Sequence, residues 1–308
     1  MVPVLPLVPL FLVAMAAPGP GPALPAHLLH QGRPRQAAMA SQRILDRDPD
    51  NPDAMATLAA AWSNTGHHAD ANAAFELALG SAWYESRGIE AHADSLRAAA
   101  SPRAAALHTE HLRASDLPIG RRIRLYIDII DDHRSTGSTT KAWTTLWEAL
   151  GVAPNAPALL AASADLRIDE GDLEGAAADL WLSLQRGPTL RAHLASGRLA
   201  LHQGRPEEAL DWHQEAMRFR SPSPRLYALR AEALRQLGHL QAASDSLDAP
   251  RARQNDDPEI MAVRLRILDD QGASKALGVL MRRTTVLYPA NHQLRATLDA
   301  LRSGAQPG

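Results

Sequence analysis

Two histidines in the segment LHTEHL come nearest to the spacing of metal ligands. His108 and His111 stand three residues apart, so on a helix they share one face, with Glu110 close by. A catalytic zinc site takes three protein ligands, no third is evident, and the H-E-x-x-H pattern of zinc proteases is absent. We interpret the pair as solvated surface histidines in preference to a metal site. His67 and His68 fall in a predicted turn, and we expect them to be exposed as well.

No group of residues in the sequence points to nucleophilic or acid–base catalysis. The chain has no G-x-S-x-G motif, no P-loop, no dinucleotide fingerprint and no cysteine. Asp131-Asp132 and Asp169-Glu170 are adjacent pairs, so on a helix their side chains diverge by about 100°. We interpret these carboxylates as solvated helix ends. The sequence predicts a protein that is not an enzyme and that has no metal and no cofactor. The alternative is a metal-binding or hydrolytic helical-repeat protein, which the pair His108 and His111 would have to support.

The overall charge gives no reason to expect a nucleic acid or an anionic membrane as partner. The formal net charge is −2 and the isoelectric point is near 6.7. Aromatic residues are sparse, and we expect most of those at helical spacing to pack between structural units without forming a platform for bases. They are Trp62, Phe75, Trp143, Trp147, Trp181 and Trp212.

The first 16 residues have the features of an export signal. An apolar core at residues 10–13 is followed by Ala14-Met15-Ala16, which resembles a cleavage site before Ala17. We expect residues 1–16 to be a signal peptide, residues 17–25 a Pro/Gly linker, and the mature chain to be periplasmic or secreted with no stable membrane span. The alternative is translation from Met15 and a cytoplasmic location.

A turn glycine recurs along the chain with a spacing of about 34 residues. It is found at seven positions, with Ala100 in the one gap: Gly32, Gly66, Gly137, Gly171, Gly204, Gly238 and Gly272. A small residue follows each turn: Ala37, Ala71, Ala105, Ala142, Ala176, Ala209, Ala243 and Ala276. Glycine accepts the left-handed conformation that ends a helix, and alanine lets the next helix pack closely. The period therefore predicts antiparallel helix pairs joined by tight turns.

Proline marks the start of several of these units. Pro52, Pro157, Pro224 and Pro258 stand where a first helix begins, the helical position that proline tolerates best. Each helix pair would bury its remaining apolar face against the next pair. The sequence therefore predicts an all-α protein without a central sheet.

The repeating unit resembles the tetratricopeptide repeat. In the segment from Pro52 to Gly80, the positions of Trp62, Gly66, Ala71 and Phe75 match the aromatic, turn and small residues of that family. The resemblance implies an α-solenoid, a right-handed superhelix of about eight repeats over residues 26–289, with a capping helix and tail over residues 290–308. It also implies a scaffold or adaptor that holds another protein.

Two units depart from the pattern. The third, Ser86 to Pro118, has Ala100-Ser101-Pro102 at its turn and lacks the aromatic residue of its second helix. In the seventh, Pro250 should end the second helix early. After the last unit, Leu294, Leu298 and Leu301 at helical spacing predict an unpaired capping helix.

The family resemblance places the first helix of each repeat on a concave surface that faces the ligand. Carried over to this chain, it predicts that basic residues of the later repeats and acidic residues of the middle repeats line the groove: Arg191, Arg198, Arg225, Arg235, Arg266, Asp131, Asp165 and Asp169. Arginine forks favour carboxylates in a partly desolvated groove, so we expect an acidic partner segment. The alternative is a mixed solvated face in which arginine stems cover apolar surface.

Overall fold

The computed structural model describes residues 23–79, 88–98, 101, 103–114, 117–219, 223–248 and 257–303. Within these ranges the chain forms 17 helices and no strand, as the period predicts. The predicted signal peptide, most of the linker, the Ala100 turn and Pro250 lie outside them. The helices are α1 Ala23–His30, α2 Pro34–Leu45, α3 Pro52–Ser63, α4 His68–Leu77, α5 Ile89–Ala98, α6 Arg103–Ala114, α7 Ile119–Ser135, α8 Thr139–Val152, α9 Pro157–Glu170, α10 Leu173–Arg186, α11 Leu190–His202, α12 Pro206–Met217, α13 Pro224–Gln236, α14 Leu240–Leu247, α15 Pro258–Asp270, α16 Ser274–Leu287 and α17 His292–Ser303.

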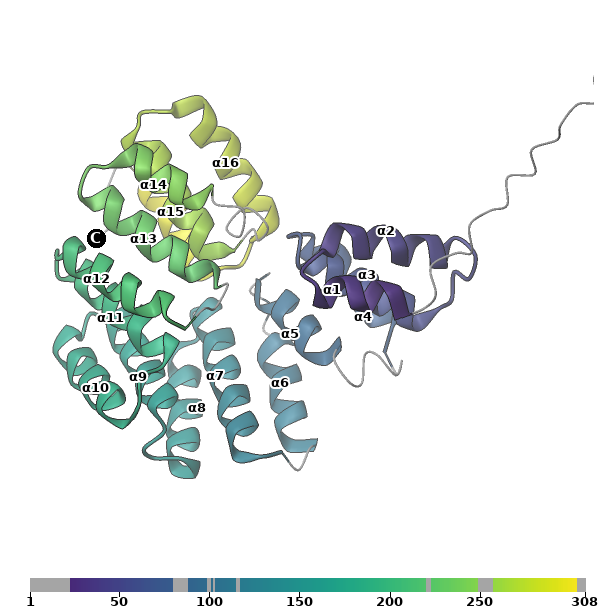
Figure 1. Cartoon of the computed structure of the whole chain (residues 1–308), viewed down its shortest axis with the longest axis horizontal. Helices are drawn as coiled ribbons and strands as arrows, with labels where there is room; N and C mark the ends of the chain where they lie inside the picture. Colours follow the sequence, from purple (N-terminus) through teal and green to yellow (C-terminus); the bar gives the residue numbers. More distant parts are fainter. Residues whose placement is uncertain are drawn as a thin grey trace, which may run out of the picture.

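The helices up to α16 follow one another as hairpin pairs around a curved stack (Figure 1). All seven predicted turn glycines have positive φ, between 66° and 84°. At Gly171 this left-handed residue ends α9 directly, and the amide of the next residue, Asp172, donates to the Arg167 carbonyl at 2.9 Å. The glycine period therefore predicted the turns correctly.

The four prolines predicted at helix starts are the first residues of α3, α9, α13 and α15. The third unit does form a helix pair, α5 and α6, although its turn departs from the pattern. The second helix of the seventh unit, α14, has only eight residues and ends at Leu247. The unpaired helix predicted after the last unit is α17.

The alanine column is buried in every pair except the last. Ala71, Ala142 and Ala176 are completely buried, but Ala276 is exposed and its prediction is wrong. The residue that packs against the core there is Leu277, one position later. A leucine keeps the two helices farther apart than alanine does. Consistent with this wider spacing, Thr284 is the one residue of α16 that is fully buried.

Clusters of small and branched residues between consecutive pairs form the core. In the middle of the chain, Leu146, Leu159 and Leu166 pack together from α8 and α9. Phe75 is fully buried, as expected. Trp147 and Trp181 are each 65% exposed, so their assignment to the core is wrong. They lie one repeat apart on the second helices α8 and α10, on faces that no other described helix covers.

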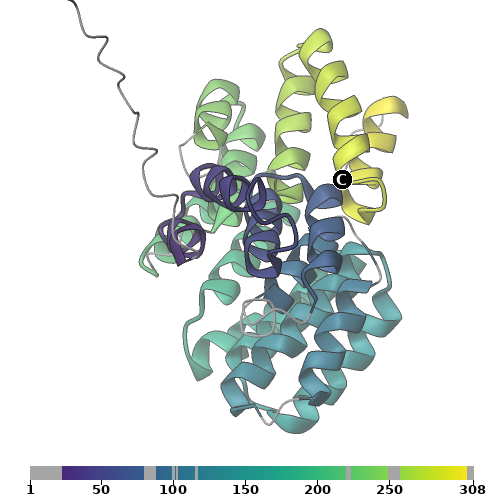
Figure 2. The same cartoon turned by 90° about the vertical axis from the view of Figure 1, so that its right-hand side faces the viewer.

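The stack curves until its end reaches its first half. Figure 2 shows the yellow C-terminal helices beside the blue helices of the N-terminal half, and α17 packs against α7. The Tyr288 ring, just before α17, lies 5.8 Å from the ring of His68 at the start of α4. The first helices of the pairs therefore surround an inner space.

Candidate partner-binding surface

One column of side chains along the first helices on this inner surface is charged in every repeat from the fourth to the eighth. Each residue precedes its turn glycine by six positions: Asp131, Asp165, Arg198, Glu232 and Arg266. Because α7, α9, α11, α13 and α15 stand side by side, the residues of this column meet across the repeats. The two arginines of the column each pair with one of its carboxylates on a neighbouring helix, Arg198 with Asp165 and Arg266 with Glu232.

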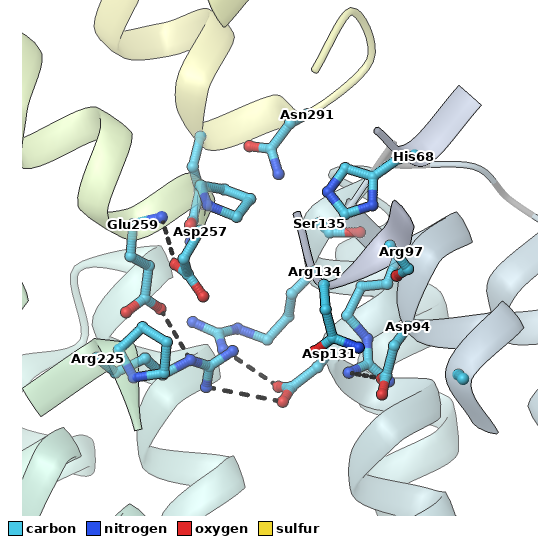
Figure 3. Close-up of a pocket in the computed structure, with 16 residues that line it drawn as sticks. His68, Asp94, Arg97, Asp131, Arg134, Ser135, Arg225, Asp257, Glu259 and Asn291 are labelled. Atoms are coloured by element: carbon cyan, nitrogen blue, oxygen red, sulfur yellow. Dashed lines mark hydrogen bonds and ion pairs between the residues drawn. The ribbon is translucent and has the colours of Figure 1, made fainter. Parts of the chain in front are cut away.

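The centre of the surface is a dense group of ion pairs around Asp131, which Figure 3 shows close to Arg134 and Arg225. The Arg191 guanidinium on α11 donates to both carboxylate oxygens of Asp131 on α7, at 3.0 and 2.7 Å. Its Nη2 also lies 2.9 Å from Asp165 on α9. Arg198 pairs with Asp165 and donates to Asp169 at 2.9 Å. Arg134 donates to Asp169 at 2.7 Å.

A second group of ion pairs continues along α13 and α15. Glu232 accepts hydrogen bonds from Arg235 at 2.8 Å and from Arg266 at 3.1 Å. Arg235 also donates to Asp270 at 2.6 Å. Arg225 lies 3.4 Å from Glu259 on α15 and 3.9 Å from Asp131 on α7. All five arginines predicted for the groove are therefore paired with carboxylates of the same chain.

The pairing controls the ionisation of the buried acids. Burial raises the pKa of Asp131, but Arg191, Arg225 and Arg134 outweigh it and hold that pKa well below its ordinary value. The same balance lowers the pKa of Asp169 to about 2. Asp128, on the same helix as Asp131, behaves oppositely: burial dominates and raises its pKa to about 6 despite the nearby Arg97. The inner surface thus holds fixed ion pairs beside a carboxyl, that of Asp128, whose pKa burial raises.

A cavity of about 650 Å³ opens among these charges. Apolar side chains of α11, α13 and α15 line part of it, including Leu194, Leu201, Leu229 and Val263. The volume lies in the range of roughly 300–1,000 Å³ that binding sites for small ligands occupy. The surface therefore combines an apolar patch with polar walls whose charges are neutralised within the chain.

Several acids and histidines that we expected at solvated positions are buried. The predictions for the pair Asp131-Asp132, for His108 and for His68 are therefore wrong. Asp131 and Asp132 are 8% and 2% exposed, and His108 is 1% exposed. The Nδ1 atom of His108 on α6 lies 2.7 Å from Asp132 on α7, and Arg97 of α5 pairs with the other oxygen of that carboxylate. Three consecutive helices are thus joined by one buried carboxylate. His68 is also buried, in contact with Tyr288, whereas His67 is exposed.

We find no cluster of three or more histidine and acidic side chains able to hold a metal ion among the residues that the structure describes. In the same residues, no helix combines the length and the apolarity needed to cross a bilayer.

The structure brings all eight predicted groove residues to the inner surface, and adds partners that sequence reasoning missed. Glu232 and Glu259 occupy the same places in their repeats as Arg198 and Arg225, so extending each column would have found them. The positions of Asn291 and His68 in the sequence give no indication that they line this surface. They lie next to each other only because of the curvature of the whole stack.

Comparison with known families finds a match for one segment of the chain. Residues 28–82 match the family model of the tetratricopeptide repeat. The chain contains tetratricopeptide repeats. No curated protein matches the sequence. Among solved structures, a chain of the APC/C heterotetramer Cut9–Hcn1 is similar in fold, with a TM-score of 0.51 and 13% identity over 89% of this chain and 54% of that chain.

Two bacterial structures align less closely. A tetratricopeptide repeat protein of Parabacteroides merdae is 15% identical, with a TM-score of 0.46 over 91% of this chain and 96% of its own. The protein pilF of Pseudomonas aeruginosa is 22% identical, with a TM-score of 0.42 over 68% of this chain and 95% of its own. At such identities the comparison with Cut9–Hcn1 supports the repeat fold and nothing finer.

Proposed function

We propose that this protein is a non-catalytic scaffold that binds a segment of a partner protein on its inner surface. The observation that carries the proposal is the cavity of about 650 Å³, whose apolar lining is framed by ion pairs on the concave side of a tetratricopeptide repeat array. Leucine side chains on α11 and α13 can bury apolar side chains of a bound segment. The surrounding guanidinium and carboxylate groups can hydrogen-bond its backbone.

The preference for an acidic segment remains a prediction, and the internal pairing modifies its expected strength. A carboxylate of the partner would have to displace Asp165 or Asp169 from Arg198, or Glu232 from Arg235 and Arg266. Exchanging one ion pair for another yields little net free energy. We therefore expect a weaker preference for acidic over neutral segments than unpaired arginines would give.

Export to the cell envelope is the second part of the proposal. It rests on the apolar core at residues 10–13 and the Ala14-Met15-Ala16 sequence, both outside the described residues. N-terminal sequencing of the protein recovered from fractionated native cells tests it, and a chain that starts at Ala17 is the expected result. An intact Met1, or a start at Met15 in the cytosol, would favour a cytoplasmic adaptor instead.

Site-specific photocrosslinking tests the binding surface. After co-isolation from native cells has identified a partner, a photoreactive residue replaces Leu194 in the cavity or, as a control, Leu77, which is 73% exposed on α4. We expect the partner to crosslink from position 194 and not from position 77. Crosslinking from position 77 alone would move the binding site away from the cavity.

A further inference from the structure

The C-terminal end of the repeat array meets the second helix pair and the turn after α7 beside the inner surface. Tyr288, between α16 and α17, is 1% exposed and packs with Met261, Leu265 and Leu294, which fixes α17 to α15. The other side of its ring faces His68 of the second helix pair. One residue thus anchors the last helix and touches the first third of the chain.

The first residue of α17 makes the second part of this contact. A Cβ atom placed on Gly137, in the turn after α7, would lie 3.0 Å from Cγ and Nδ1 of His292 and 3.4 Å from its Cβ. Such distances are tighter than ordinary contacts, so a side chain at position 137 would require His292 to move by a few tenths of an ångström. Gly137 therefore serves two purposes, the left-handed turn at φ 71° and the close approach of α17.

Asn291 joins this contact to the inner space. Its side-chain oxygen accepts the amide of Leu294 at 3.0 Å and so caps α17, and the residue is only 4% exposed. Asn291 and His68 line a pocket of about 370 Å³, and Arg225 and Asp131 line it too. Figure 3 shows His68 and Asn291 on one side of this pocket and the ion pairs on the other.

The contact of Tyr288 and His292 with the first half of the chain, here called the closing contact, buries fewer apolar side chains than the interfaces between consecutive pairs. Among the residues that the structure describes, it buries one aromatic ring, and the side chains of His68, Asn291 and His292 that take part in it are polar. Neighbouring pairs bury whole clusters of leucine, isoleucine and alanine. Since local opening starts where few apolar contacts are buried, this contact should open before any interface between repeats.

We propose that α17 with Tyr288 and Asn291 is a latch that closes the superhelix, and that a partner segment reaches the cavity only after the latch has opened. The inference rests on the proposed function in placing the partner in the cavity. The existence of the latch does not depend on partner binding, so it can be tested without a partner.

A disulfide can lock the latch, because the chain has no cysteine of its own. The Cβ separation of 3.4 Å at Gly137 and His292 is close to the roughly 3.5–4.5 Å that disulfides span. The variant Gly137→Cys/His292→Cys, oxidised, holds the latch closed. The variant Gly137→Ser/His292→Ser carries similar backbone strain without the bond, and is the matched control.

A thiol on the cavity wall then reports access. Ser223→Cys places it in the larger cavity, and Ala178→Cys, exposed on the outer helix α10, is its control. The probe is a maleimide at the end of a ten-residue Gly-Ser peptide. We expect oxidation of the lock to slow labelling at position 223 by about tenfold or more relative to the serine control, with no change at position 178.

Two outcomes would overturn the latch. Equal labelling rates at position 223 in the locked and unlocked chains would show that the probe enters without release of α17. Failure of the two cysteines to form a disulfide in the native chain would show that α17 does not rest on the α7 turn in solution. Neither measurement uses a partner, so each result leaves the photocrosslinking test of the proposed function standing.

Discussion

At the scale of single residues, the buried carboxylates of the inner surface hold arginines from several repeats together. We expect Asp131→Asn to lower the free energy of unfolding by about 3 kcal/mol, because it leaves Arg191 and Arg134 buried beside a neutral amide. Asp172→Asn is the control: that carboxylate pairs with Arg167 at the surface and caps α10, a task asparagine also performs. Chemical denaturation of both variants measures the difference, and equal stability would contradict this role of Asp131.

Burial of His92 predicts a dependence of stability on pH. Desolvation lowers its pKa to about 4, with Glu76 opposing and Arg103 adding to the shift. Because the unfolded histidine titrates near pH 6.5, the unfolded chain takes up this proton first on acidification. The contribution of neutral His92 is therefore complete above about pH 6.5 and is lost as the pH falls toward 4.

We expect His92→Phe to remove this part of the pH dependence. Phenylalanine keeps the stacking on Phe75, whose ring centre lies 4.9 Å from that of His92. Between pH 7 and pH 5, the wild-type chain should lose about 2 kcal/mol more stability than the variant. Melting curves at the two pH values measure this, and equal losses would mean that His92 is protonated in the folded chain.

At the scale of helices, the alanine column determines how closely a pair packs. Ala176 is completely buried between α9 and α10, so we expect Ala176→Leu to overpack the pair and cost about 1–3 kcal/mol. Ala276→Leu tests the corrected register, because that residue is exposed. It should change stability by less than about 0.5 kcal/mol. A large loss at position 276 would restore the register predicted from the sequence.

Local chemistry explains why the helices were predictable. A positive φ at Gly66 or Gly238 and a first-turn proline at Pro157 or Pro224 depend on a few neighbouring atoms, so the sequence carries them directly. The error at Ala276 arose because alanine is common and one was present a single position before Leu277. Patterns of small residues define the register of a pair less sharply than turn glycines do.

At the scale of the whole molecule, prediction from the sequence weakens. The residues of the inner surface could be assigned from their place in each repeat, but their partners depend on how the repeats are rotated relative to one another. Small rotations between consecutive repeats accumulate along a solenoid. The accumulated rotation brings the last helix back to the first half of the chain. Only for this reason does His68 contact Tyr288 and Gly137 contact His292.

The inner ion pairs also bear on how the molecule unfolds. In an ideal solenoid each repeat contacts only its neighbours, and unfolding can proceed from one end. Here Arg191 on α11 binds Asp131 on α7 and passes over the intervening α9, while Arg225 on α13 reaches the same carboxylate. These links join repeats that are not neighbours, so the later helices should unfold together with the middle ones.

We therefore expect Arg191→Met to separate the unfolding of the C-terminal helices from that of the middle of the array. Amides of α13 and α15 should exchange with solvent at least about tenfold faster in the variant, while those of α9 change less. Arg218→Met is the matched control, because Arg218 is a surface residue paired with Glu215 one turn away in sequence. Hydrogen exchange followed by mass spectrometry resolves the helices in both variants. If Arg191→Met and Arg218→Met leave the same exchange pattern, stacking alone accounts for the cooperativity, and the ion pairs across the inner surface serve only to shape the cavity.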